Sequence, residues 1–326
     1  MASILVAGAG PSGCAFAIVA ARRGHGVTLM DEGRRRPPWS GESLPAGGGQ
    51  LLESVFGAGV LDGQAPSYGT AAAWSSPELV AHDFMAHWSG EGWHLDRVVL
   101  DARLQQACAM VGVDVRSGTS EPSSGEYDWV IDATGRSGAI AARQGAQHVR
   151  FDDQIALVAT VPDRGGPRVT TVESCAAGWW YSQPVAGGDR VVALVTDADL
   201  VEGDRTDFWS AQLARTEHVL QHVDITPTEV AAYPAGASAR DPIVGDCWLA
   251  IGDAAVSFDP LSSQGLITGV VMAAHAALTL DAGDAALEAW AADYRVVLEE
   301  HLQVRAAFWS QEERWSTAPF WMRRQR

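Results

Sequence analysis

The N-terminal residues carry the pattern that most constrains the fold, a glycine-rich turn between an apolar strand and a helix of small residues. Residues 3–8 (SILVAG) are predicted as the strand, and CAFAIVAARRG follows as the helix. Between them, Gly8, Gly10 and Gly13 form GxGxxG in the strand–turn–helix setting of a dinucleotide-binding site. The first glycine allows the tight turn, the second lets the backbone approach a pyrophosphate, and the third permits close helix packing.

A second predicted strand, residues 26–30, supports the same site. It ends at Asp31, about twenty residues beyond the glycine turn, where a carboxylate can bond ribose hydroxyls. Strand, turn, helix, second strand and terminal acid together predict a dinucleotide site, without distinguishing FAD from NAD.

Residues 248–271 are a second candidate for cofactor binding. An apolar run, 248–251, is predicted as a buried strand, and an apolar helix is predicted over 266–277. The loop between them is polar and contains Asp259-Pro260, a pair that favours an extended or turn conformation. The start of the helix carries a partial positive charge that attracts an anion or an electron-rich ring edge. An ordinary strand-to-helix connection is the alternative.

Composition limits the class of protein. The chain has 326 residues, 47% of them hydrophobic, enough for one large or two modest domains. The net charge of −17 argues against a nucleic-acid partner. No apolar run is long enough to predict a membrane span, and no basic leader predicts a signal peptide. Four separated cysteines without a CxxC pair are interpreted as reduced thiols of a cytoplasmic protein.

Two further observations concern catalytic chemistry. His218 and His222 lie four residues apart on a helix predicted over 207–221, but no third ligand is near, so no metal site is predicted. The sequence contains no lysine, because all 23 basic residues are arginine. A mechanism that needs a lysine amine therefore cannot operate in this chain.

The middle of the chain changes character. Residues 151–233 contain alternating segments (QIALVATV, RVTTVES, GWWYSQPV, RVVALVTD) that predict antiparallel strands, an inserted sheet. Residues 68–98 are rich in aromatics, including Trp74 and Trp88, and predict strands that line a pocket. From residue 282 the pattern predicts helix, and the tryptophan- and phenylalanine-rich end is expected to pack as a closing flap.

Three motifs recur in one order in a known superfamily: GxGxxG, D-A-T-G-R (132–136) and the late G-D (252–253). Over nearly its whole length the chain resembles the aromatic hydroxylases and flavin-dependent halogenases. Within them it is similar to the flavoproteins that mature quinone-cofactor amine oxidases, a group implied to oxygenate a tryptophan in a partner polypeptide. The narrower resemblance rests on G-E-S-L-P (41–45), H-L-D-R (94–97), G-W-W-Y-S-x-P (178–184), V-T-D (195–197), D-P-L-S-S-Q-G (259–265) and E-R-W-x-x-x-P-F-W-x-R-R (313–324).

The resemblance implies an α/β fold with FAD as cofactor. A Rossmann-type FAD-binding domain is expected over 1–74, 95–150 and 235–285, an antiparallel substrate domain over 75–94 and 151–234, and a helical flap over 286–326. Asp253 is implied to bind ribitol, and the 259–265 segment to lie against the flavin ring. The predicted cofactor contacts are Gly8, Gly10, Pro11, Ser12, Gly13, Asp31, Glu42, Ser43, Arg97, Asp132, Gly135, Gly252, Asp253, Pro260, Ser263, Gln264 and Gly265.

The resemblance also implies oxygen insertion into an electron-rich aromatic, a tryptophan-derived or peptide-bound substrate, through a C4a-hydroperoxyflavin. Trp74, Trp179, Trp180 and Tyr181 are the predicted substrate wall. Asp259, Glu42 and His94 are candidate bases by motif position only. Without a second GxGxxG, electrons are expected from transiently bound NAD(P)H or a separate flavin reductase.

Two alternatives stay open, a flavin-dependent dehydrogenase or saturating reductase, and a flavin-bearing maturation chaperone without chemistry. Halogenation is not expected, since halogenases hold hypohalous acid on a lysine. Their W-x-W-x-I-P motif and halide-side S-G or T-G turn are also replaced here, by residues 179–184 and by Gln264-Gly265.

Overall fold

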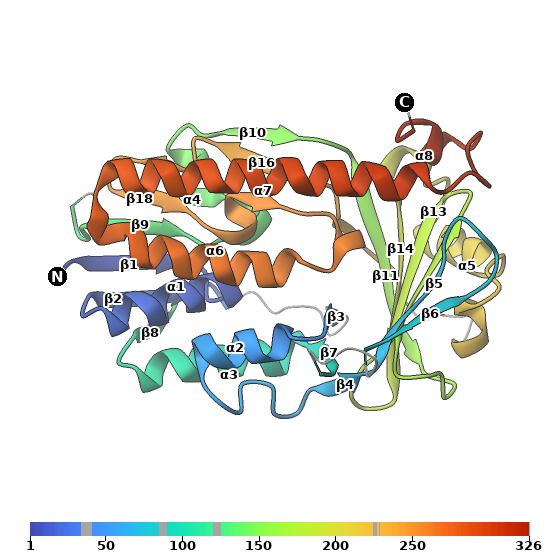
Figure 1. Cartoon of the computed structure of the whole chain (residues 1–326), viewed down its shortest axis with the longest axis horizontal. Coiled ribbons are helices and arrows are strands. Elements are labelled where there is room, and N and C mark those ends of the chain that lie inside the picture. Colours follow the sequence, from blue (N-terminus) through green and yellow to red (C-terminus); the bar gives the residue numbers. More distant parts are fainter. Residues whose placement is uncertain (34–40, 85–89, 120–124, 224–226, 228, 326) are drawn as a thin grey trace.

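The computed structural model describes residues 1–33, 41–84, 90–119, 125–223, 227 and 229–325. Residues 34–40 and Trp88 lie outside the described residues. A parallel sheet with its helices forms one end of the molecule, and a large antiparallel sheet stands across the other end (Figure 1).

The six-stranded sheet confirms the predicted Rossmann-type arrangement. All its strand pairs are parallel except β17–β18. In register, Asp132 lies beside Ala7 on one side and beside Ala250 on the other, so the loops that follow β1, β9 and β18 leave the sheet at the same edge. In spatial order the strands are β17 (Val244–Gly245), β18 (Trp248–Ala250), β9 (Trp129–Asp132), β1 (Ser3–Ala7), β2 (Gly26–Asp31) and β8 (Asp114–Ser117).

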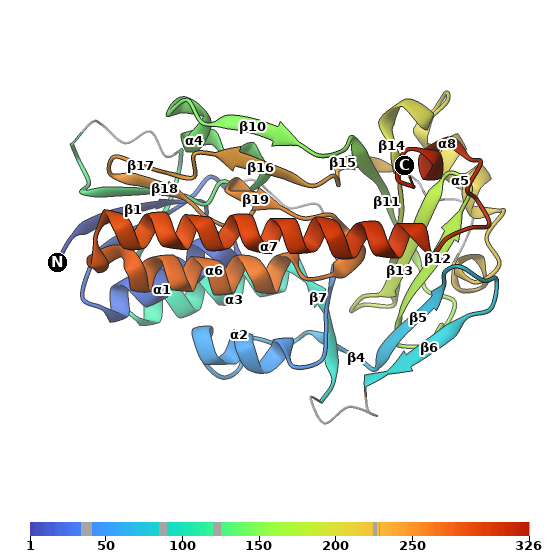
Figure 2. The same ribbon diagram turned by 45° about the horizontal axis from the view of Figure 1, so that its top comes forward.

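Helices pack beside this sheet in successive rows. α1 (Pro11–Arg22) packs against α3 (Arg97–Met110) and against α6 (Gly265–Thr279), and α7 (Asp284–Ser310) packs on α6 (Figure 2). Trp290 of α7 donates to the Met272 carbonyl, 3.0 Å away. Among the described residues, one segment, Gly265–Ala282, is long and apolar enough to cross a membrane. Because α6 packs between two other helices, we interpret this segment as a core helix.

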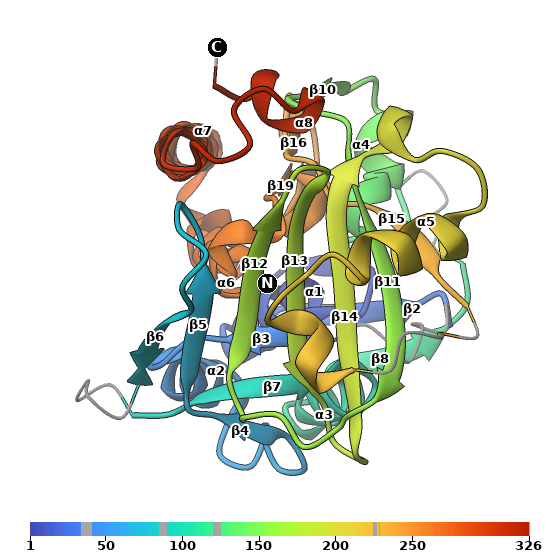
Figure 3. The same ribbon diagram turned by 90° about the vertical axis from the view of Figure 1, so that its right-hand side faces the viewer.

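The seven-stranded sheet confirms the predicted inserted sheet. Its pairs are antiparallel except β12–β5. One face packs against α5 (Arg205–Leu213) and the other faces the half that contains the parallel sheet (Figure 3). In spatial order the strands are β15 (Ala231–Pro234), β11 (Gln154–Pro162), β14 (Asp189–Asp197), β13 (Gly178–Pro184), β12 (Thr170–Cys175), β5 (Gly69–Ala73) and β6 (Val80–Asp83).

Two expectations change here. β5 belongs to this sheet, although the expected boundary placed residues up to 74 in the FAD-binding domain. α5 ends at Leu213, and a separate short turn covers Val219–His222, so His218 and His222 do not share one helix as predicted. Within the described residues, no group of three or more His, Cys, Asp or Glu could hold a metal. The remaining domain boundaries stay predictions.

Short elements join the two halves. Two three-stranded sheets and two further helices lie between or beside the large sheets. They are β3 (Gly41–Leu44), β7 (Gly92–Asp96) and β4 (Ala65–Ser67); β10 (Gln147–Arg150), β16 (Ser238–Asp241) and β19 (Val256–Ser257); and α2 (Gly48–Phe56) and α4 (Ala139–Arg143).

The C-terminal part differs from the expected flap. α7 is one 27-residue helix whose first half lies in the nucleotide-side core with Trp290 and Tyr294. Its end and α8 (Pro319–Met322) pack on the seven-stranded sheet through Trp309, Phe320 and Trp321. The helix thus connects both halves and is not a separate cover.

Candidate cofactor and substrate site

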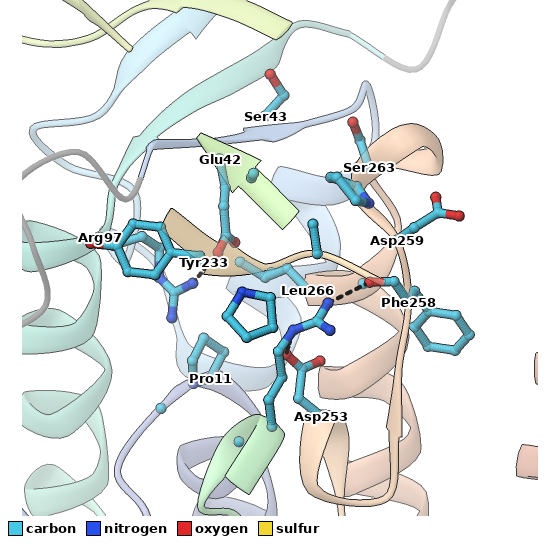
Figure 4. A pocket seen from close by; sticks show the side chains of 18 of the residues that line it. Pro11, Glu42, Ser43, Arg97, Tyr233, Asp253, Phe258, Asp259, Ser263 and Leu266 are labelled. Atoms are coloured by element: carbon cyan, nitrogen blue, oxygen red, sulfur yellow. Dashed lines mark hydrogen bonds and ion pairs between the residues drawn. The ribbon is translucent and has the colours of Figure 1, made fainter. Parts of the chain in front are cut away.

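A cavity of about 490 Å³ lies where the two halves meet. It is bounded by the first turns of α1 and α6, by β3, and by the inner face of the seven-stranded sheet (Figure 4). Fourteen of the predicted site residues line it: Gly10, Pro11, Ser12, Gly13, Glu42, Ser43, Arg97, Gly135, Tyr181, Asp253, Asp259, Pro260, Ser263 and Gly265.

The first glycine turn has the geometry that its sequence predicts. Gly8 has φ +114°, and a Cβ there would stand 2.1 Å from the Ala133 carbonyl oxygen. A Cβ on Gly13 would stand 1.9 Å from the Gly8 carbonyl oxygen. α1 begins at Pro11, and its N-cap residue, Gly10, provides no side-chain cap; its first turn contains no acidic residue. Its first amide groups are therefore available to an anion in the cavity.

The turn at Gly252-Asp253 packs closely against the glycine turn at the start of α1. Gly252 has φ +57°, and a Cβ there would stand 2.3 Å from Ser12 Oγ. Its amide donates to the Tyr294 hydroxyl of α7, 3.0 Å away. The next side chain, Asp253, is 45% exposed and lies at the cavity with its carboxylate 3.8 Å from Arg136 Nε (Figure 4).

Arg136 is a site residue that sequence reasoning missed. It lines the cavity and donates to two carbonyls, those of Gly236 (2.6 Å) and Phe258 (2.7 Å). The arginine that ends D-A-T-G-R was the available signal, since it follows a predicted cofactor-binding glycine directly.

The 259–265 loop leads into the second open helix terminus. Ser263 has φ +51°, and at Gly265 a Cβ would meet nothing within 4 Å. α6 has no side-chain cap and no acidic residue in its first turn. The two helices thus direct uncapped N-termini toward one cavity, and both ends favour negative charge. Gln264 is exposed and lies outside the cavity lining.

Glu42 and Arg97 form an ion pair on the cavity wall (Figure 4). Glu42 is 40% exposed, whereas Arg97 is buried and also contacts Asp101, 3.2 Å away. Burial works against the charge of Arg97, but the two carboxylates outweigh it and raise the pKa of the guanidinium. The Arg97 guanidinium in this pair therefore stays positively charged.

Two predicted acids have other partners. Asp132 is fully buried and accepts bonds from the amides of Thr134 (3.0 Å), Ile140 (2.9 Å) and Ala141 (2.8 Å). The prediction that it contacts cofactor is therefore wrong, because its carboxylate organises the turn into α4. Asp31 accepts from the Gly33 amide and from Gln105, each at 3.0 Å. Its predicted ribose contact stays a prediction.

The structure separates the three candidate bases. The Asp259 carboxylate is 1% exposed, contacts Arg305 and points away from the cavity centre (Figure 4). Burial would raise its pKa, but nearby His301 and Arg305 outweigh this and lower it. Burial lowers the pKa of His94 to about 4, and His94 lies behind the cavity wall. Neither suits proton abstraction at neutral pH, which leaves Glu42.

His94 belongs to a buried polar cluster between β3, β7 and the seven-stranded sheet. The Gln183 side-chain oxygen accepts from Ser43 Oγ at 2.6 Å and contacts His94 Nδ1 at 3.2 Å. Tyr181 donates to the same oxygen, and Ser43 also contacts Thr170. This cluster joins the strand that carries Glu42 to the sheet behind it.

The predicted aromatic substrate wall is largely wrong. Trp180 points to the opposite face of the sheet and stacks edge-on against Trp209, because neighbouring strand residues alternate in direction. Trp179 and Trp74 pack against the C-terminal aromatics. Tyr181 alone of the four lines the cavity. The observed wall consists of Ala156, Val158, Val191, Ala193, Val195 and Tyr233.

No protein-family model matches the chain. LodB of Marinomonas mediterranea, named as an FAD-dependent oxidoreductase, is 27% identical over 98% of this chain and 96% of LodB. QhpG, described as a peptidyl tryptophan dihydroxylase essential for tryptophylquinone cofactor biogenesis, superposes with a TM-score of 0.85 and 24% identity, covering 99% of this chain and 78% of QhpG. The flavin-dependent halogenase CmlS has a TM-score of 0.82 and 21% identity, covering 100% of this chain and 68% of CmlS.

The chain has the fold of flavin-dependent hydroxylases and halogenases. The predicted α/β class, the inserted antiparallel sheet and the resemblance to this superfamily are thereby confirmed. The match to LodB extends over almost the full length of both chains.

Proposed function

We propose that the protein is an FAD-dependent monooxygenase that hydroxylates the indole ring of a tryptophan residue in a polypeptide. The observation that carries this proposal is a cavity that has the two glycine turns at one end and an apolar sheet face at the other. LodB is named as an FAD-dependent oxidoreductase, and QhpG, a protein of the same fold, as a peptidyl tryptophan dihydroxylase; the two names support the proposal.

The residues present fit an FAD molecule. The cradle of Gly8, Gly10 and Gly13 leaves the α1 amides open for the pyrophosphate. Asp253, half exposed at the cavity, would hold ribitol hydroxyls. The uncapped start of α6 would lie against the electron-rich end of the flavin ring. Reduced FAD, when bound, supplies the activation of O₂ from which one oxygen atom is transferred to the substrate.

The sheet wall supports a flat, apolar substrate. Ala156, Val158, Val191, Ala193 and Val195 are small, and they project side by side from β11 and β14. Short side chains on adjacent strands leave room for a bicyclic ring, and an apolar wall excludes water from the reacting atoms. Tyr181 and Tyr233 border this area and provide aromatic contacts.

Glu42 would act as the base in this reaction. Its carboxylate faces the cavity and keeps partial solvent access, unlike Asp259 and His94. It would accept the proton that the indole ring loses when aromaticity is restored after oxygen transfer. The Arg97 ion pair would hold the carboxylate in place. NAD(P)H or a separate flavin reductase would supply the electrons.

Halogenation is a poor fit for this site. The halogenases that the chain resembles hold hypohalous acid on a lysine amine, and this chain contains no lysine. Oxygen transfer needs no such amine, because the aromatic ring itself attacks the activated oxygen.

A single-turnover experiment tests the proposal. FAD bound to the purified protein is reduced under argon, and O₂ is then admitted with Gly-Trp-Gly or, as a matched control, Gly-Phe-Gly. We expect oxygen to be incorporated into the tryptophan peptide, measured by mass spectrometry with ¹⁸O₂. Reoxidation that releases only hydrogen peroxide with both peptides would contradict the proposal, and a flavin that no donor reduces would indicate a non-catalytic role.

A further inference from the structure

A buried charged group lies beside the 259–265 loop; Asp259 borders the cavity, whereas Asp152 and Arg305 are not part of its lining. The group contains Asp152, Asp259 and Arg305, with exposed side-chain fractions of 11%, 1% and 7%. Arg305 Nη1 donates to Asp152 Oδ2 at 2.6 Å and to Asp259 Oδ2 at 3.0 Å. None of the three takes part in the proposed reaction.

Asp259 fixes the start of the loop. Its Oδ1 accepts from the Leu261 amide at 3.0 Å and so closes the turn that begins at Pro260. Three residues later, Ser263 has φ +51°, a left-handed conformation that is unfavourable for a residue other than glycine. Such strain persists where the surrounding structure holds the backbone in place.

Two arginines hold the loop from opposite sides. Arg136, on the cavity side, donates to the Phe258 carbonyl. Arg305, on α7, holds the Asp259 carboxylate and reaches Asp152, whose Oδ1 accepts from the Gln154 amide at 3.2 Å. The loop is therefore tied to the first residue of β11 in the seven-stranded sheet.

The position of Arg305 is itself restrained. Its guanidinium stacks over the Trp309 ring at 4.3 Å, and His301 Nε2 lies 3.7 Å from the same Asp259 oxygen. A guanidinium stays protonated in proteins, so it provides a permanent partner for a carboxylate that is out of reach of water. Without that partner, burial of Asp259 would be strongly unfavourable.

We propose that Arg305 is a positioning residue for the flavin end of the cofactor site. It holds Asp259, and thereby the 259–265 loop and the first turn of α6, in the place that receives the flavin ring. The inference rests on the proposed binding of FAD. It adds a role for a residue outside the cavity, on a helix that joins both halves.

The test compares two ligands that occupy different lengths of the site. ADP reaches only the glycine turn at α1, whereas FAD also reaches the loop and α6. We expect Arg305→Gln to raise the dissociation constant of FAD about tenfold, equivalent to about 1.4 kcal/mol, and to change that of ADP less than twofold. Equal weakening of both ligands would indicate a general structural role and overturn the proposal, as would no change in either.

Three variants sharpen the test. Arg295→Gln is the matched control, because Arg295 lies on the same helix in an exposed pair with Asp241. Arg305→Lys keeps the charge and should recover part of the FAD affinity. Asp259→Asn separates positioning from direct charge. Positioning predicts weaker FAD binding in both Asp259→Asn and Arg305→Gln, whereas a direct charge effect on anionic FAD predicts opposite changes.

Hydrogen exchange separates this inference from the proposed function. In the protein without FAD, Arg305→Gln should speed amide exchange over residues 259–268 at least tenfold, and Arg295→Gln should not. If the wild-type chain fails to bind FAD, the proposed function fails, and the exchange result still decides whether Arg305 orders the loop. Unchanged exchange in Arg305→Gln would overturn its role.

Discussion

Replacing Gly13 by alanine tests the closest backbone contact of the nucleotide site. The new Cβ would stand 1.9 Å from the Gly8 carbonyl oxygen and 3.1 Å from the Ala133 Cβ. The first turn of α1 would have to retreat by roughly 1.5 Å to restore an ordinary van der Waals distance. Overpacking of this kind costs about 1–3 kcal/mol. At about 2 °C per kcal/mol for a chain of this size, the melting temperature should fall by about 2–6 °C.

The effect on nucleotide binding should be larger than the effect on stability. The retreating turn carries the amides that would contact the pyrophosphate, and small misplacements of such donors weaken binding steeply. We expect FAD affinity, measured by quenching of flavin fluorescence, to fall at least a hundredfold, which is about 2.7 kcal/mol. Gly26→Ala is the control, because its nearest neighbour, the Ala2 carbonyl oxygen, is 3.9 Å away. If Gly13→Ala binds FAD as tightly as Gly26→Ala, the reasoning about close packing is wrong.

Three other predictions concern the sheet wall, a buried histidine and the C-terminal segment. Ala193→Phe should abolish hydroxylation of Gly-Trp-Gly while changing FAD affinity less than twofold, because the ring would fill the small-residue wall; retained turnover would show that the substrate binds elsewhere. His94 has a pKa of about 4 when folded against about 6.5 unfolded, so its contribution to stability is complete above pH 6.5 and is lost as the pH falls toward 4. In urea denaturation, His94 should lower the free energy of unfolding by about 2 kcal/mol at pH 5 relative to pH 7. His94→Gln should remove this pH dependence; if the pH dependence is unchanged in the variant, groups other than His94 cause it. Asp197→Asn leaves Arg324 buried without its charge partner, whereas Arg323 is half exposed and stays hydrated, so the free energy of unfolding should fall by roughly 2–4 kcal/mol. The control Asp241→Asn removes an exposed ion pair and should change the free energy of unfolding by less than about 0.5 kcal/mol. Equal effects of the two variants would refute the distinction between buried and exposed ion pairs.

Local patterns predicted the nucleotide half well. Gly8, Gly13 and Gly252 could be identified from the sequence because each lies near the end of a predicted strand or the start of a predicted helix. A glycine at such a place indicates a backbone conformation or a close contact that a side chain would prevent. Their convergence also followed, since parallel strands release their loops at one edge. Arg136 was missed although it ends a recognised motif, because its carbonyl partners lie 100 and 122 residues away.

The half with the seven-stranded sheet was predicted less well, for a physical reason. Alternation along residues 178–184 says that Trp179 and Trp180 face opposite sides, but it does not say which side borders the cavity. The observed wall uses the least conspicuous residues, Ala156 and Ala193, which carry no motif. Asp259 was assigned by its motif to catalysis, yet its partner Arg305 lies 46 residues further on and could not be paired with it from spacing alone.

The 27-residue helix α7 has a mechanical consequence for how substrates enter. At about 1.5 Å per residue it is roughly 40 Å long. Tyr294 in its first half bonds the Gly252 amide, and Trp309 near its end packs on the antiparallel sheet. Because α7 packs on both halves, it opposes their opening and closing as rigid bodies. Under the proposed function, a polypeptide substrate would reach the cavity through shifts of individual loops, and crosslinking α7 to either half would leave turnover intact.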